Sequence, residues 1–306
     1  MDQKDIKSIN GFRSNQAILE YVSEKNPNPE IAKSRFKDAL KVIKIWARHN
    51  GIYDNRLGFL SGISLAIMLA KILQLFPNLE VNGIIKQFFQ TFASRWDWKK
   101  MDVQLGSRSE EMKVQMQSQQ RKCMHIITPA YPEYNTTDRV KMINFNIIVA
   151  KLIASNDYIQ NQKNIVWEKI VEKENFINHY KLFIEIDLIQ NKKGEIGQFI
   201  AQKKYFALRL LNLFDQLKGI EYDPEKIEVR PWPIFFDKKD PDYPYCAAFL
   251  IGLKNKMHQP VQYSLQEWIV GFAKQLINNQ KYQKKKIKTQ EEKDKKDEED
   301  NLDDFL

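Results

Sequence analysis

The 306-residue sequence has only two cysteines, Cys123 and Cys246, which excludes a disulfide framework and favours a reducing intracellular compartment. It has no apolar run near the roughly 20 residues that cross a bilayer, and its first residues lack the apolar segment of a signal peptide. The cysteines and the four histidines are scattered without the spacing of zinc ligands, and no glycine-rich phosphate loop is present. We therefore expect no membrane partner and no zinc site.

Apolar residues make up 43% of the chain, enough to build cores in about two domains. The net charge is +9, and the segment 281–306, with eight lysines and nine acidic residues, contributes −1 of it. This leaves +10 on residues 1–280, a balance that favours a polyanionic partner, nucleic acid before membrane. Simple solubility explains the same charge equally well.

Helical periodicity dominates the first part of the sequence. Residues 29–50 have the pattern of an amphipathic helix, residues 58–76 are apolar almost all round and predict a buried core helix, and residues 81–95 predict a third. The segment 99–122 is rich in Gln, Ser, Lys and Arg and is typical of a surface loop. These patterns predict a helical domain over residues 1–125.

A second unit is predicted over residues 126–280. Its patterns are helical at 137–158, 165–173, 194–217 and 264–278, and strand-like at 180–188, 226–236 and 246–253. Helices mixed with strands indicate an α+β fold in which one sheet packs on helices as an α/β sandwich. Residues 281–306, a lysine cluster followed by an acidic run, predict a disordered charged tail. The lysine cluster fits a nuclear-import signal or a solvated tail equally well.

Four short sequence motifs serve as landmarks along the chain. They are Ser8-Ile-Asn-Gly-Phe-Arg13, the stretch from Lys44 to Ser64, Phe88-Phe89 with Trp96-Asp-Trp98, and Ile126-Ile-Thr-Pro-Ala-Tyr-Pro132. In this order they resemble eukaryotic poly(A) polymerase over most of residues 1–278. The resemblance implies a central helical domain, a C-terminal RNA-binding domain similar to an RNA-recognition fold, and a nuclear protein.

The resemblance also implies roles for particular residues. Poly(A) polymerase transfers adenylates from ATP to an RNA 3′ end, and Lys44 and Tyr53 match family residues that contact the ATP phosphates. Asn55 matches a residue that helps hold the nucleotide, and Gly62 and Ile63 match positions on the adenine side. From the residues alone, Lys44 fits a helix-surface lysine and Tyr53 a packed loop tyrosine. Asn55 likewise fits a helix cap, and Gly62 close helix packing.

RNA binding needs cations for phosphates and flat rings for unpaired bases. The candidates are Arg121, Lys122, Lys141, Lys203, Lys204 and Arg209 for phosphates, and Tyr131 and Tyr134 for bases. Each cation taken alone fits a solvated surface charge, and each tyrosine fits packing at the domain junction.

The metal-binding chemistry of the family has no counterpart in this sequence. Nucleotidyl transfer uses two divalent metals held by carboxylates, and in the family three Asp precede the landmark that here begins at Ser8. The turn Leu105-Gly106-Ser107 is followed by no Asp-x-Asp, and Glu185 and Asp187 fit a solvent face. We therefore expect no catalytic residue and no metal ligand here. The resemblance implies ATP and Mg²⁺ or Mn²⁺ only where a catalytic domain is supplied.

The leading hypothesis is the central and RNA-binding portion of a poly(A) polymerase, which contributes an ATP-pocket wall and RNA binding to mRNA polyadenylation. Alone it would be inactive, and its partners would be an RNA 3′ end, a separate nucleotidyltransferase domain and 3′-end processing factors. The alternative is a non-catalytic RNA-binding or scaffold subunit of an RNA-processing assembly. A generic basic helical protein is a third hypothesis, which the ordered landmarks disfavour.

Overall fold

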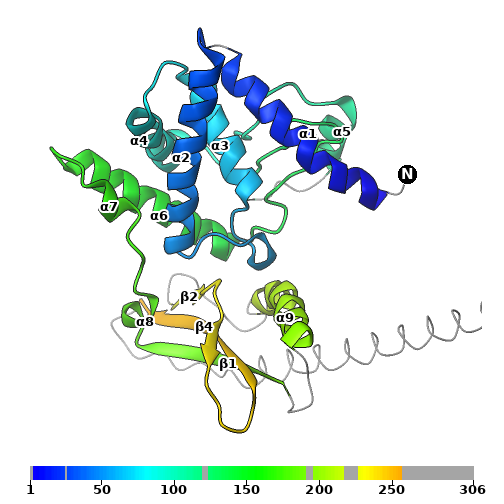
Figure 1. Cartoon of the computed structure of the whole chain (residues 1–306), viewed down its shortest axis with the longest axis vertical. Helices are drawn as coiled ribbons and strands as arrows, with labels where there is room; N and C mark the ends of the chain where they lie inside the picture. The colour runs from blue at the N-terminus through cyan, green and yellow to red at the C-terminus, as the bar shows by residue number, and fades with distance from the viewer. Residues whose placement is uncertain (1–2, 25, 119–122, 191–195, 217–226, 257–306) are drawn as a thin grey trace, which may run out of the picture.

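The computed structural model describes residues 3–24, 26–118, 123–190, 196–216 and 227–256. Figure 1 shows a body of helices above a smaller body made of an antiparallel sheet and helix α9. This mixture confirms the α+β class expected from the sequence. Among the described helices, none is long and apolar enough to cross a membrane.

Five helical elements open the helical body. They are α1 (Gln3–Ser23), α2 (Pro29–His49), α3 (Gly62–Leu75), α4 (Val81–Gln90) and a π-helical turn, η2 (Thr91–Arg95). The start of α2 follows from its sequence, because the Asn28 side chain accepts a hydrogen bond from the backbone of Ile31 and Pro29 occupies the first turn.

The predicted helix over 58–76 begins later than expected. Residues Asn55–Leu57 form a short 3₁₀ helix, η1, which ends at Gly58 with a φ of 76°, in the left-handed region. Helix α3 then starts at Gly62, because Ser61 and Ser64 form a reciprocal capping box. The start predicted from apolar character was wrong because Phe59 and Leu60 are core residues that lie in the loop between η1 and α3.

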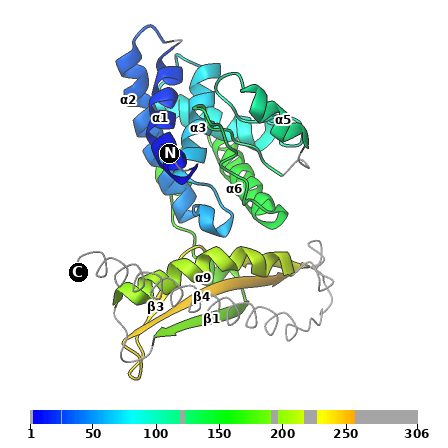
Figure 2. The same cartoon turned by 90° about the vertical axis from the view of Figure 1, so that its right-hand side faces the viewer.

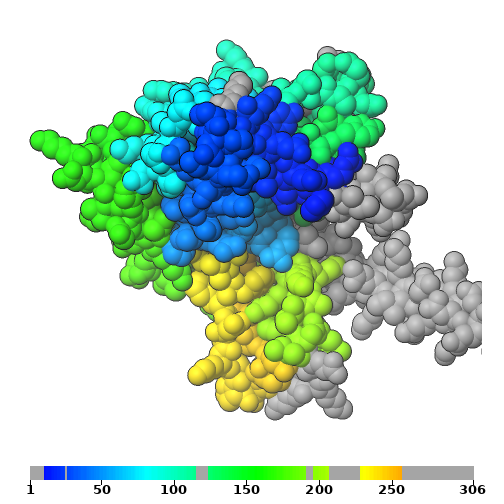
Figure 3. Space-filling model, turned by 45° about the horizontal axis from the view of Figure 1, so that its top comes forward, coloured from blue at the N-terminus to red at the C-terminus, as the bar shows by residue number. Residues whose placement is uncertain are grey.

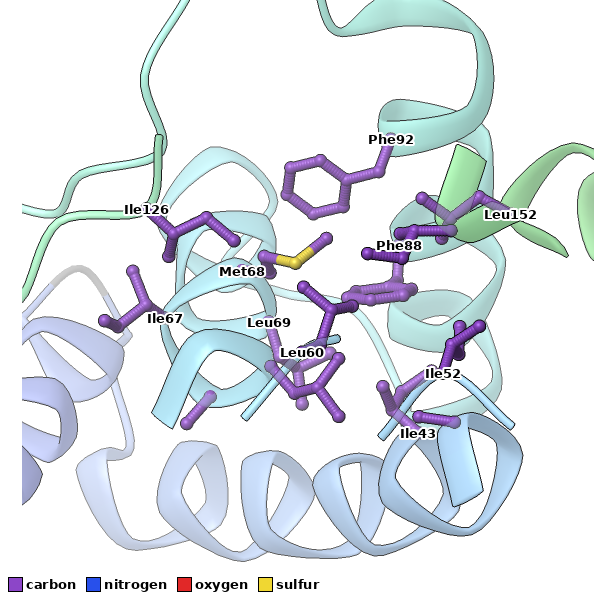
Figure 4. Close-up of a cluster of buried hydrophobic side chains, with 14 of the residues drawn as sticks. Ile43, Ile52, Leu60, Ile67, Met68, Leu69, Phe88, Phe92, Ile126 and Leu152 are labelled. Atoms are coloured by element: carbon purple, nitrogen blue, oxygen red, sulfur yellow. The ribbon is translucent and has the colours of Figure 1, made fainter. Parts of the chain in front are cut away.

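The core of this body forms around α3, as Figure 4 shows. Ile43, Ile52, Leu60 and Phe88 are fully buried around it. Trp46 adds an edge-on aromatic contact with Phe89, with ring centroids 4.9 Å apart. Burial of α3 on nearly all sides explains why its sequence is apolar all round.

Residues from Ile126 to Asn161 pack on the helical body. Ile126 and Leu152 belong to its core (Figure 4), and helix α6 (Met142–Asn161) lies against α4 and η2. The buried Asn144 side chain donates to the Leu57 carbonyl at 3.0 Å. These contacts tie residues 126–161 to the helical body, and the domain boundary predicted at residue 126 stays a prediction.

The segment 99–122 is not wholly a loop, because α5 (Glu110–Ser118) lies within it. Ser109 accepts a hydrogen bond from the backbone of Met112 at 3.3 Å. Glu110 and Glu111 occupy the first turn, where their negative charges interact favourably with the positive end of the helix dipole. Met112 is the buried anchor. The polar composition gave no helical period, and Met112 is the only buried residue among those of α5 whose side chains are described.

The second body is a four-stranded antiparallel sheet. Its strands are β1 (Leu182–Gln190), β2 (Ile227–Pro231), β3 (Phe236–Lys238) and β4 (Tyr245–Asn255), with β4 pairing with all three others. The single strand predicted over 226–236 was wrong, because Pro231 and Pro233 lack the N–H that a continuous ladder needs.

Helix α9 (Ile196–Gln216) covers one face of this sheet, on the side toward the helical body (Figure 2). Its Phe206 packs edge-on against Phe249 of β4, with centroids 5.9 Å apart. Short helices α7 (Trp167–Ile170) and α8 (Phe176–His179) lie in the connection from α6. The RNA-recognition likeness stays a prediction, and the predicted helix at 264–278 and tail at 281–306 lie outside the described residues.

A buried ionic cluster joins the two bodies. Arg230 of β2, with a side chain only 3% exposed, donates two hydrogen bonds to the Glu174 carboxylate, at 2.6 and 2.5 Å. Lys151 of α6 lies 2.9 Å from the same carboxylate. Burial raises the pKa of Glu174, but hydrogen bonds and charge from Arg230 and Lys151 outweigh it, and the net shift of the pKa is downward.

We expect Gly51→Ala to destabilise the protein by about 1–3 kcal/mol. Gly51 has a φ of 61°, and a Cβ there would overlap the ring of Trp232. Gly11→Ala is the matched control, since Gly11 lies inside α1 with nothing within 4 Å of its Cβ position. Urea unfolding should show a lower midpoint for Gly51→Ala and an equal or higher one for Gly11→Ala. Equal effects of the two changes would contradict this account of Gly51.

We expect Glu174→Gln to cost about 3 kcal/mol at pH 7, because it leaves Arg230 and Lys151 without their buried counter-charge. The folded-state pKa of Glu174 is depressed, so its charge stabilises the fold above the unfolded pKa of about 4.3 and ceases to do so as the pH falls through the folded pKa. The difference from wild type should therefore shrink only below about pH 4.

Urea unfolding at a series of pH values measures this difference. Glu80→Gln is the control, since Glu80 pairs with Arg35 at the surface, and its effect should stay under about 1 kcal/mol. A Glu174→Gln effect as small as the control, or one independent of pH, would contradict the prediction.

Candidate functional site

The candidate site is formed where α2 ends and α3 begins. Lys44 lies on the last two turns of α2, and the chain then turns at Gly51 and runs through Tyr53, which makes a single β-bridge to Leu60. This return brings Tyr53 to the first turn of α3, which begins at Gly62. Residues 18 positions apart in the sequence are thereby placed together.

Lys44, Tyr53 and Gly62 converge on one point. A Cβ built on Gly62 would lie 3.0 Å from the Tyr53 hydroxyl, 3.6 Å from Cε of Lys44 and 3.7 Å from its Nζ. An ammonium group, a phenol hydroxyl and the N-terminus of a well-capped helix therefore lie together. This combination suits an anion, because a helix N-terminus carries partial positive charge, and a side chain at position 62 would crowd both polar groups.

Arg48 adds a second cation that the sequence did not single out. Its guanidinium carbon lies 4.9 Å from the centroid of the Tyr53 ring, in a cation–π contact. Arg48 lies five residues before Tyr53, on a helix that ends at His49. The two side chains meet because the chain reverses at Gly51.

Asn55 and Ile63 are held by the surrounding fold. The Asn55 side chain donates to the Thr136 carbonyl at 3.0 Å, while Ser64 donates to the Thr136 hydroxyl at 2.9 Å. Asn55 is therefore not the cap of α3, a role that Ser61 takes. Ile63 is half-buried and packs against the helical core. Sequence reasoning did not single out Thr136 as the residue that ties Asn55 to α3.

The predicted RNA-binding residues that the structure describes lie partly on α9 and partly on the helical body. Arg121 and Lys122 lie outside the described residues, and so does the side chain of Arg209 on α9. Lys203 donates to Asp237 at 2.6 Å and lies over the rings of Phe199 and Phe235. That lysine is thus already paired on the sheet body, while its neighbour Lys204 is exposed.

The remaining candidates lie on the helical body. Tyr131 is exposed and its carbonyl accepts a hydrogen bond from Arg13 at 2.8 Å, with Tyr134 nearby and partly exposed. Lys141 precedes α6 at its N-cap position. The rings of Tyr131 and Tyr134 are exposed.

Within the described residues, no three His, Cys, Asp or Glu side chains are grouped to hold a metal. Glu185 and Asp187 are exposed, as predicted, and both accept hydrogen bonds from Lys238, at 2.7 and 2.9 Å. The Gly-Ser turn at Gly106 has a packing role, because a Cβ there would overlap the Tyr21 hydroxyl of α1.

In comparison with known proteins, the matching family model covers mainly residues of the helical body. The family model described as the poly(A) polymerase central domain matches residues 35–173. A curated poly(A) polymerase of Dictyostelium discoideum is 29% identical over 267 residues, which make up 83% of this chain and 31% of that protein. Nuclear poly(A) polymerase 1 of Arabidopsis thaliana is 27% identical over 268 residues, 85% of this chain and 35% of that protein.

The chain thus spans about a third of the length of these relatives. A solved structure of a cytoplasmic RNA terminal U-transferase superimposes with a TM-score of 0.39 at 13% identity, over 46% of this chain and 59% of that chain, a likeness too low to carry an argument. The family model covers α3, α4 and α6, and includes Lys44, Tyr53 and Gly62. Residues 35–173 of this chain are therefore a eukaryotic poly(A) polymerase central domain.

Proposed function

We propose that this chain supplies one wall of an ATP pocket and an RNA-binding surface to mRNA polyadenylation. The observation that carries the proposal is the convergence of Lys44, Tyr53 and the Gly62 turn within a poly(A) polymerase central domain. The name of the Arabidopsis relative supports a nuclear location, which we include in the proposal.

The phosphates of ATP are the chemical group that this wall suits best. Lys44 supplies a point charge, and the Tyr53 hydroxyl and the first backbone amides of α3 supply directed donors. The absence of a side chain at Gly62 leaves room for a ligand to approach the backbone. Ile63, half-buried beside it, offers an apolar edge on the adenine side.

The wall supplies binding groups and no acid, base or metal ligand. Adenylyl transfer requires divalent metals that align the attacking hydroxyl and neutralise the leaving pyrophosphate. We propose that Mg²⁺ or Mn²⁺ is held by the carboxylates of a separate nucleotidyltransferase domain facing this wall. The 306 residues alone would then bind without catalysing transfer, and assembly with 3′-end processing factors is part of the same proposal.

RNA binding is proposed on the charge of the chain and on exposed side chains. Residues 1–280 carry +10, and exposed Lys204 and Tyr131 are of the types that contact phosphates and stack on bases. Lys203 contributes less, because Asp237 already neutralises it.

We expect Lys44→Met to weaken ATP binding by about tenfold, the loss of one charge-assisted hydrogen bond. The control is Lys37→Met, which removes an exposed lysine from the same helix away from Gly62. ATP titrated into the ¹⁵N-labelled chain, followed through the amide signals of Gly62 and Ile63, measures both. The proposal fails if wild type shows no ATP-dependent shift at these amides, or if both variants bind as wild type does.

We expect no adenylyl transfer when the purified chain is mixed with ATP, Mg²⁺ and an oligo(A) primer. Robust primer extension would overturn the proposal of an incomplete site. Extension after addition of a separate nucleotidyltransferase domain would support the composite enzyme. Primer binding with neither ATP shifts nor reconstituted extension would favour the alternative, a non-catalytic RNA-binding or scaffold subunit.

A further inference from the structure

The sheet body contacts the stretch from Lys44 to Ser64 on both sides of Tyr53. On one side, Glu174 of the connection between α7 and α8, Arg230 of β2 and Trp232 just after β2 contact the turn formed by His49, Asn50 and Gly51, which we call the Gly51 turn. On the other side, α9 lies against η1. Figure 3 shows the surface of the sheet body directly against that of the helical body.

Each residue of the Gly51 turn has its own partner from the later chain. The His49 carbonyl accepts from the backbone of Glu174 at 3.0 Å, and the Asn50 carbonyl accepts from the Arg230 guanidinium at 2.8 Å. Gly51 lies against the Trp232 ring so closely that a Cβ would overlap it.

Trp232 is itself fixed. Its ring stacks on that of Phe176, with centroids 4.6 Å apart and planes within 20°, and Arg230 lies over it at 5.4 Å. Arg230 is in turn held by both oxygens of Glu174. The two side chains that contact the Gly51 turn are therefore rigid parts of the sheet body.

The conformation of the Gly51 turn determines where Tyr53 lies. From Gly51 the chain passes through Ile52, whose amide donates to the Ala47 carbonyl at 2.9 Å and whose carbonyl accepts from Leu60 at 3.2 Å. Tyr53 follows at once, with its hydroxyl beside Gly62 and its ring under Arg48. Only Ile52 separates Gly51 from Tyr53, so a displacement of the turn would also displace Tyr53.

We propose that Arg230 and Trp232 are positioning residues for the nucleotide-facing wall: through the Gly51 turn, the sheet body fixes the Tyr53 hydroxyl over the start of α3. This inference rests on the proposed function, because it gives Tyr53 a ligand to meet. It assigns the sheet body a part in nucleotide binding that is separate from contact with RNA.

The test replaces Trp232 by Leu in the full chain labelled with 3-fluorotyrosine. The ¹⁹F signal of Tyr53, assigned by its loss in Tyr53→Phe, reports the position of the ring without any ligand, and ATP titration reports binding. We expect Trp232→Leu to shift or broaden the Tyr53 signal and to weaken ATP binding by about tenfold, as when one hydrogen bond to the ligand is lost.

The control is Tyr245→Leu, which removes a ring that stacks on Phe199 at the start of β4, the opposite end of that strand from the residues that pair with β2. It should lower the melting temperature but leave the Tyr53 signal and the affinity unchanged. If Trp232→Leu does not fold, Arg230→Lys serves instead, because it keeps the charge but loses the bidentate geometry.

The outcomes separate the two proposals. If Trp232→Leu shifts the Tyr53 signal but the wild-type chain does not bind ATP, the proposed function is wrong and the positioning contact is still supported. An unchanged Tyr53 signal in both Trp232→Leu and Arg230→Lys, with melting temperatures lowered as in the control, would overturn the positioning role and reduce these residues to a domain contact.

Discussion

The arrangement of the two bodies depends on one buried charge, the guanidinium of Arg230. Removing it from water is costly, and the cost is offset by two hydrogen bonds to Glu174, a third to the Asn50 carbonyl and the rings of Phe176 and Trp232. Arg230 lies on β2, and its hydrogen-bond partners come from the connection after α7 and from the end of α2. A single desolvated cation thus requires three distant segments to meet, and with them the Gly51 turn and Trp232.

One residue of the candidate site, Tyr53, is linked to this meeting through the Gly51 turn. Lys44 is positioned by α2 and Gly62 by the capping of α3, and both are set locally by strong helix signals. Tyr53 has no helix to hold it and depends on the turn before it and on the single bridge to Leu60. Tyr53 is therefore the residue of the wall that local sequence signals fix least. It is also the one whose preceding turn, at Gly51, contacts the sheet body.

Of the helices in residues 1–125, the sequence predicted α2, α3 and α4 and missed α1 and α5. Period and caps located α2, α4 and most of α3, since a buried apolar face leaves a plain 3.6-residue signal. The helix α5 was missed because its polar sequence gives no apolar period, and the domain boundary at 126 stays a prediction although Ile126 and Leu152 pack in the helical core. Lys44, Tyr53 and Gly62 were found through resemblance, whereas Arg48 and Thr136 were not singled out.

The sequence alone determined the α+β class, the family of residues 35–173 and the chemical types present in the wall, because local propensity and motif order are written along the chain. Tertiary structure decided that Lys203 is neutralised by Asp237, that Arg48 covers Tyr53, and that Arg230 and Trp232 contact the Gly51 turn. These contacts join residues up to 181 positions apart, as in the contact of Gly51 with Trp232. They arise from the desolvation of a charge and the close fit of a ring on a glycine, which no local pattern encodes.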